Sequence, residues 1–258
     1  MPAIPPPKHD NISQAPLTLP IRRHKFDTPK LRLQLNDLAH EGSSNFLSNI
    51  KGNEDLEEQV QNVLNLLYTP ESKRPGTRSV TFIIRDAGGV AYTTGIDLDD
   101  DHKEIHLNLG YIKNKPRYEL LGVICHELVH CFQWNAEGTC PGGLIEGIAD
   151  WVRLRAGLAA KHWKQVADGR WDAGYQQTGY FLEWLEHNFG PGTVRSINDC
   201  LRNCKYDEEK VFGSCCEGHK VDDLWKDYGD DLKKKKKRED EKAAKKTEDV
   251  EREEEHER

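Results

Sequence analysis

The chain has 258 residues, of which 36% are hydrophobic and 31% are charged, and its formal net charge at pH 7 is −7. This length can build one apolar core of roughly 200 residues, and no second block of apolar periodicity predicts another. The acidic balance argues against general nucleic-acid binding, which needs a basic face against the phosphates. No stretch approaches the roughly 18 uninterrupted apolar residues of a transmembrane helix, so no membrane partner is expected.

Three parts are expected along the chain. Residues 1–24 are rich in proline and lack periodicity, which predicts a flexible arm. Residues 25–229 carry the apolar patterns and predict the folded domain. Residues 230–258 are dense in charge and predict disorder or a solvated helix. The basic run Lys233–Arg238 could act in nuclear import, although such runs are usually only soluble surface.

The N-terminus has no basic segment followed by an apolar run, so it predicts no secretory signal. A cytoplasmic location is therefore expected, or a secreted one if a leader is missing. Seven cysteines, an odd number, favour reduced thiols in such a chain. The later cysteines fit no strong zinc-finger spacing and would form disulfides in an oxidising compartment. These are Cys200, Cys204, Cys215 and Cys216.

The first half of the chain mixes strand and helix patterns. Alternating leucines predict a strand near 31–35, and helical spacing predicts helices at 37–48 and 53–68. Three further strands are expected, at 79–85, 90–95 and 104–109, with Asp99–Asp101 at a solvated hairpin tip. Consecutive strands of this kind indicate a small mixed or antiparallel sheet.

The second half is predicted to be helical. Residues 117–134 are apolar nearly all round, which is typical of a core helix. A second helix is expected at 144–156, where Gly147 and Ala149 should let it approach the first closely. The aromatic-rich segment 162–189 also has helical spacing. The predicted fold class is therefore α+β, with a helical C-terminal subdomain.

One motif lies inside the apolar helix, His126-Glu127-Leu128-Val129-His130. Two histidines four residues apart on a helix can reach one metal ion, while Glu127 points beside them. Buried imidazoles need partners, and a metal would satisfy both at once. The motif therefore predicts a hydrolytic zinc centre, which typically takes three protein ligands and leaves one position for water.

The third ligand is expected on the next helix. Glu146 lies sixteen residues after His130 and is our choice, with Asp150 one turn further as its rival. We expect Asp150 to accept the far N–H of His126 or His130 and so fix its tautomer, although the two roles could be exchanged.

The mechanism expected of such a centre follows from the charge of zinc. Zinc lowers the pKa of a water molecule toward about 7, and Glu127 removes its proton and later passes it to the leaving amine. The developing oxyanion needs another donor, for which the candidates are Tyr175, Tyr180 and His162. Tyr175 is preferred.

The chain resembles a known family at these residues. The runs CHELVHCFQWN (125–135) and PGGLIEGIADWVRL (141–154) are similar to the basic secretory protein family of plant and bacterial zinc peptidases. Shorter matches at 89–95, 156–157, 162–163, 174–175 and 181–182 extend the resemblance over roughly 31–201.

The resemblance implies a zincin-like fold for residues 25–229, with a small sheet over the metal-bearing helix and a helical lower half. The pair Glu146 and Asp150 is similar to the glutamate-zincin pattern. It also implies an extended peptide substrate paired along one strand, at 105–109 or 90–94. The acidic composition and the absence of a predicted leader depart from the family's descriptive name.

The leading hypothesis is therefore a zinc-dependent peptidase that acts on peptide or protein substrates. The alternative is a catalytically weak or inactive protein of the same fold, in which zinc stabilises a binding or stress-defence function. A third reading is a metal-free scaffold with core histidines. The sequence carries no signal for oligomeric state or side-chain preference.

Overall fold

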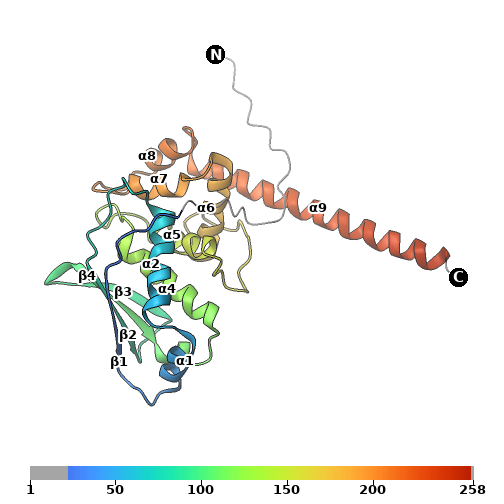
Figure 1. Ribbon diagram of the computed structural model, residues 1–258. Coiled ribbons are helices and arrows are strands. Elements are labelled where there is room, and N and C mark those ends of the chain that lie inside the picture. The colour runs from blue at the N-terminus through green and yellow to red at the C-terminus, as the bar shows by residue number, and fades with distance from the viewer. Residues whose placement is uncertain (1–22, 257–258) are drawn as a thin grey trace.

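The computed structural model describes residues 23–256, with side chains described up to residue 243. The expected proline-rich arm, residues 1–24, therefore lies almost wholly outside the described residues. The rest is a mixed α+β fold, as predicted. Figure 1 shows a small sheet on one side, a bundle of helices packed against it, and one long helix that extends away from the body.

The sheet has four strands in the order β1-β2-β4-β3. Strands β1 (Lys30–Leu35), β2 (Ser79–Arg85) and β4 (Asp99–Asn108) run parallel, and β3 (Ala91–Ile96) pairs antiparallel with β4 at the edge. The mixed alternative of the prediction is therefore confirmed. Phe82 and Ile84 on β2 face the core and are fully buried, so register is fixed by one apolar face.

One strand boundary differs from the prediction. Asp99–Asp101 does not form a hairpin tip. These residues are the first three of β4, and Asp99 pairs with Ile96 of β3. Aspartate has low β propensity, but pairing within the hairpin of β3 and β4 outweighs this propensity at the start of β4. The carboxylate of Asp99 also forms an ion pair with Arg78.

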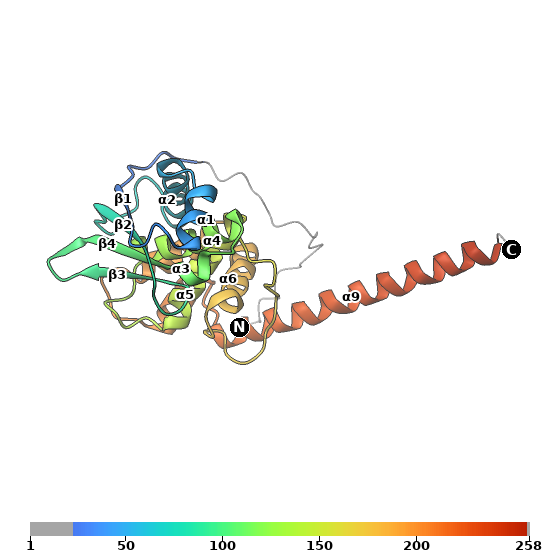
Figure 2. The same cartoon turned by 90° about the horizontal axis from the view of Figure 1, so that it is seen from below.

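The helices occupy most of the second half of the chain. They are α1 (Glu41–Asn49), α2 (Asn53–Leu67), α3 (Leu109–Ile112), α4 (Arg117–Phe132), α5 (Gly142–Arg155), α6 (Tyr175–Phe189), α7 (Thr193–Cys200), α8 (Glu208–Cys215) and α9 (Val221–His256). Helix α4 lies between the sheet and the other helices, in contact with α2, α5 and β3, as the two views agree (Figures 1 and 2).

Helix α4 is fixed at both ends by polar contacts. At its start, Arg117 forms a two-pronged ion pair with the buried carboxylate of Asp55 on α2, with N–O distances of 2.6 and 2.7 Å. At its end, the hydroxyl of Tyr68 donates to the carbonyl of Phe132. Two residues further on, the backbone N–H of Trp134 donates to the side-chain oxygen of Asn198 at 3.1 Å.

The segment before α6 is not helical, which corrects the helix predicted at 162–189. Gly157, Gly169 and Gly174 adopt positive φ angles there and interrupt helical continuity. The tryptophans that suggested a helix instead anchor a loop: the Trp171 ring packs edge-on against Phe212 at 5.0 Å between centroids. The aromatic spacing therefore predicted helix correctly from residue 175 onward but not before it.

Helices α5 and α6 cross very closely, and Gly147 allows it. A Cβ atom on Gly147 would lie 2.3 Å from Thr178 Cγ2 on α6. Gly147 was expected to let α5 approach α4 closely, but it lies instead at the contact of α5 with α6. Between α4 and α5 the corresponding glycine is Gly122, whose added Cβ would lie 2.6 Å from Arg153 Nε.

The first turns of α9 bury Val221, Leu224 and Tyr228 in the core. The outer part of the helix extends away from the body in both views (Figures 1 and 2). The charged segment from residue 230 is helical as far as His256. None of the helices in the described part of the chain combines the length and apolar character that crossing a membrane would require.

Candidate metal centre

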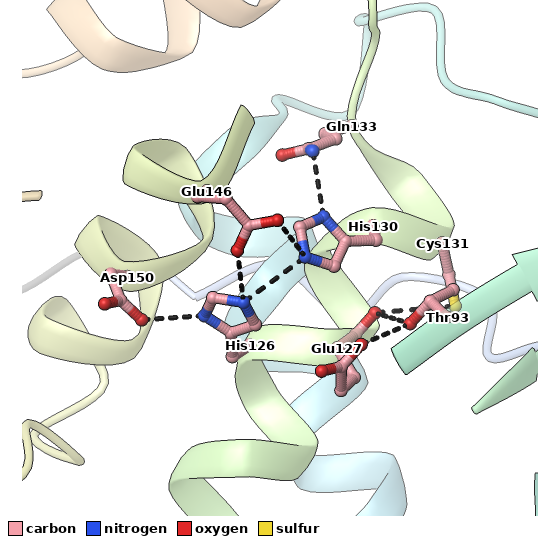
Figure 3. Close-up of polar contacts among 8 residues, drawn as sticks. All are labelled: Thr93, His126, Glu127, His130, Cys131, Gln133, Glu146 and Asp150. Carbon is pink, nitrogen blue, oxygen red and sulfur yellow. Dashed lines mark hydrogen bonds and ion pairs between the residues drawn. The ribbon is translucent and has the colours of Figure 1, made fainter. Parts of the chain in front are cut away.

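Two helices bring the motif residues together. Helix α4 supplies His126, Glu127 and His130, and α5 supplies Glu146 and Asp150. Figure 3 shows Glu146 facing the two imidazoles across the space between the helices, with Asp150 on the other side of His126 and Glu127 turned toward Thr93. The i, i+4 spacing on α4 places the histidines on the same face, as expected.

The donor atoms of His126, His130 and Glu146 lie close enough together to hold one metal ion. His126 Nε2 lies 3.1 Å from Glu146 Oε2 and 3.3 Å from His130 Nε2, and His130 Nε2 lies 3.8 Å from Glu146 Oε1. Ligands about 2.0–2.2 Å from zinc at tetrahedral angles lie about 3.3 Å apart. Among the described residues, His126, His130 and Glu146 are the group whose donors converge closely enough to hold a metal ion.

Asp150 lies on the far side of His126. Its Oδ1 accepts from His126 Nδ1 at 2.7 Å, and its side chain is almost fully buried. In a neutral imidazole, a proton on Nδ1 leaves the lone pair on Nε2, which is the nitrogen on the side of Glu146. Glu146 and Asp150 therefore lie on opposite sides of the His126 ring.

The two imidazoles differ in charge in the metal-free protein. Burial would lower the pKa of His126, but hydrogen bonds with Asp150 and Glu146 outweigh it and raise that pKa to about 9. Burial and the neighbouring charge of His126 lower the pKa of His130. Below about pH 9, His126 is protonated on both nitrogens, and a metal ion would have to displace the proton on Nε2.

Glu127 lies beside the histidines and is 6% exposed. Burial raises the pKa of its carboxyl group, against the opposing effect of His126 and of the Thr93 hydroxyl. Thr93 Oγ1, on the edge strand β3, donates to Glu127 Oε2 at 2.7 Å. A buried carboxylate with a raised pKa is suited to accept and return a proton.

Tyr175 is the aromatic candidate that faces the centre. Its ring lies nearly parallel to that of His126, with centroids 6.4 Å apart, and 60% of the residue is exposed. The charge of Glu146 raises the pKa of Tyr175, so its hydroxyl stays protonated. Tyr180 instead packs edge-on against Trp163, and His162 is exposed in the preceding loop.

A family model described as a peptidase of plants and bacteria, BSP, matches residues 28–228. The chain belongs to the BSP family. This confirms the resemblance to the basic secretory protein family, and it makes peptides or proteins the class of substrate expected. Searches of curated proteins and of solved structures returned no match to the chain.

Two partners of this BSP-family centre were missed by sequence reasoning. Gln133, whose Nε2 lies 3.0 Å from His130 Nδ1, is only three residues after that histidine and could have been found by helical spacing. Thr93 lies 34 residues from Glu127 and carries no local signal. Only the pairing of β3 with the sheet brings it to the site.

The structure excludes one of the two strands expected to pair with a substrate. Residues 105–109 belong largely to β4, which pairs with β2 on one side and β3 on the other. Its backbone groups are therefore already paired, and that alternative is wrong. Strand β3 pairs on one side only among the described residues.

Proposed function

We propose that this BSP-family protein is a zinc-dependent peptidase. The observation that carries the proposal is the convergence of two imidazole nitrogens and one carboxylate within 4.8 Å of one another, beside a second, buried carboxylate. Two histidines and a glutamate form a known ligand set of catalytic zinc, in which the fourth position is left for water. We assign His126, His130 and Glu146 as the ligands and Asp150 as the residue that orients His126.

A zinc ion bound there would lower the pKa of a water molecule and polarise the carbonyl of the scissile bond. Glu127 would act as the general base and take the proton of that water. Because the carboxyl group is buried and its pKa is raised, it would also hold the proton long enough to transfer it to the leaving amine. Thr93 would keep the carboxylate oriented through its hydroxyl group.

The hydroxyl group of Tyr175 would donate a hydrogen bond to the oxygen on which negative charge develops. Its position supports this role, because Tyr175 is the first residue of α6 and its ring lies nearly parallel to that of His126. The packing of Gly174 against Gly143 of α5 holds the turn in place.

We propose that the peptide substrate binds as an extended strand along the free edge of β3. Backbone N–H and C=O groups on that edge would give affinity without side-chain selection. The contact between Thr93 and Glu127 supports this placement, because it brings the middle of β3 against the proposed base. A peptide on this edge would run past the metal centre.

The test is the substitution Glu127→Gln, with Glu137→Gln in an exposed loop as the matched control. We expect Glu127→Gln to keep stoichiometric zinc and to lose peptide hydrolysis, whereas Glu137→Gln keeps both. Unchanged proteolysis by the purified Glu127→Gln variant would refute the assignment. Zinc binding without hydrolysis of any peptide by the wild type would instead favour the zinc-stabilised binding protein.

A further inference from the structure

Gln133 contacts the nitrogen of His130 that points away from the proposed metal position. It is the first residue after α4, and its Nε2 lies 3.0 Å from His130 Nδ1. Its Oε1 is buried and has no hydrogen-bond partner among the described residues. The amide therefore has one end at the imidazole and the other end unsatisfied.

A metal ion on His130 would determine which of the two side chains donates in this hydrogen bond. His130 Nε2 faces His126 and Glu146, so Nε2 is the nitrogen available to an ion. A neutral imidazole that gives its Nε2 lone pair to a metal carries its proton on Nδ1 and must donate from there. The amide then has to present Oε1 to Nδ1, which a half-turn about the last side-chain bond provides, because the two ends are nearly the same shape.

We propose that Gln133 is the positioning residue of His130, the counterpart of Asp150 on His126, and that its carbonyl holds His130 in the metal-binding tautomer. The inference rests on the proposed metal site. A neutral amide suits this place because a carboxylate would add a further negative charge near Glu127 and Glu146. An amide can also donate to Nδ1 when no metal is bound, which a carboxylate cannot.

The test compares zinc affinity, measured by competition with a chelating dye, in Gln133→Met and Gln133→Glu. Methionine keeps the length and loses the acceptor, so we expect about 10–100-fold weaker zinc binding. Glutamate keeps the acceptor, so we expect affinity equal to or tighter than that of the wild type. Gln61→Met is the control. Gln61 hydrogen-bonds with Phe26 and Thr28 and has no contact with the proposed metal ligands.

Melting of the metal-free variants separates positioning from folding. We expect Gln133→Met and Gln133→Glu to melt alike without zinc and to differ only in zinc affinity. Equal zinc affinity in Gln133→Met and the wild type, or equal losses in both variants, would overturn this inference alone. A wild-type protein that binds no zinc would overturn the proposed metal site as well.

A second inference comes from the late cysteines. The thiols of Cys200, at the end of α7, and Cys215, at the end of α8, lie 3.8 Å apart and are both partly exposed. Cys204 instead lies against the carbonyl of Cys200, and Cys216 is buried. We infer that Cys200 and Cys215 form an oxidisable pair: a peroxide takes two electrons and two protons from the thiols, giving one disulfide and two waters.

The pair would fasten α8 to the helix that supports the end of α4, since Asn198 on α7 accepts from Trp134 N–H. Peptide mapping after mild peroxide treatment tests it, with Cys204→Ser as the control for Cys215→Ser. We expect a Cys200–Cys215 bridge and higher thermal stability in the wild type and in Cys204→Ser, and neither in Cys215→Ser. A bridge through Cys204 or Cys216, or no bridge, would overturn the inference.

Discussion

At the residue scale, the two histidines differ in what faces the nitrogen away from the metal position. A buried carboxylate faces His126 and an amide faces His130. Against the effect of burial, the carboxylates of Asp150 and Glu146 raise the pKa of His126, whereas burial and the charge of His126 lower the pKa of His130. The difference in partners makes separate predictions for ligands and for orienting residues.

Glu146→Gln and Asp150→Asn should both weaken zinc binding, but not equally. Asp150→Asn leaves the three donors in place and should cost about 10–100-fold in affinity. Glu146→Gln removes a charged ligand and should cost more. Competition with a chelating dye measures both. If Asp150→Asn proved the more damaging change, the roles of the two carboxylates would be exchanged.

Tyr175→Phe should lower kcat by about 10²–10³-fold, as removal of one oxyanion donor does, and leave zinc content unchanged. Tyr180→Phe is the matched control, because Tyr180 lies on the same helix as Tyr175 but packs against Trp163. Steady-state kinetics with one peptide substrate compare the two variants. Full activity in Tyr175→Phe would remove this residue from the mechanism.

At the element scale, the position of α4 depends on its contacts with α2, which include the two-pronged ion pair of Asp55 with Arg117. Asp55 is 3% exposed and also accepts from the N–H of Lys51. The Arg117 hydrogen bond lowers the pKa of Asp55 despite the opposing effect of burial. The pair therefore stabilises the fold only while the carboxyl group is ionised.

Asp55→Asn should lower the free energy of unfolding by about 2–3 kcal/mol at neutral pH, a moderate figure for a buried group because Arg117 is partly exposed. A carboxyl group whose pKa is depressed by folding stabilises above its unfolded pKa, about 3.9. The difference between wild type and variant should be constant from about pH 5 to 7 and shrink as the pH falls below about 4. Urea unfolding across this range measures it, and a difference independent of pH would contradict it.

Gly147→Ala tests the crossing of α5 and α6. The new methyl group would meet Thr178, and overpacking of this kind costs about 1–3 kcal/mol. The neighbouring Glu146 and Tyr175 should shift, so activity should fall together with the melting temperature. Gly142→Ala on the same helix is the control, because its added Cβ would meet nothing within 4 Å. Equal behaviour of the two variants would contradict the close crossing.

The elements that the sequence predicted well are those with a strong local signal. The all-round apolar pattern predicted α4, and its i, i+4 histidines predicted the donor pair that the fold brings to Glu146. The failures at Asp99–Asp101 and 162–174 arose where pairing or loop packing outweighed local pattern. Thr93 could not be found, because its contact with Glu127 exists only once β3 joins the sheet.

At the scale of the whole molecule, the centre lies where the sheet meets the helical half. Strand β3 supplies the free edge and the contact to Glu127, α4 supplies the histidines, and α5 and α6 supply Glu146 and Tyr175. Membership of the BSP family over residues 28–228 covers all four of these elements. The outer part of α9 lies beyond that match and away from the centre (Figure 1).

The central claim is that peptide hydrolysis depends on one zinc ion at His126, His130 and Glu146. Elemental analysis of the gently purified protein, paired with a peptide-cleavage assay before and after chelation, tests it most directly. The account predicts one zinc per chain, loss of cleavage when the zinc is removed, and recovery when zinc is returned. Undiminished cleavage by protein shown to be free of metal would contradict it.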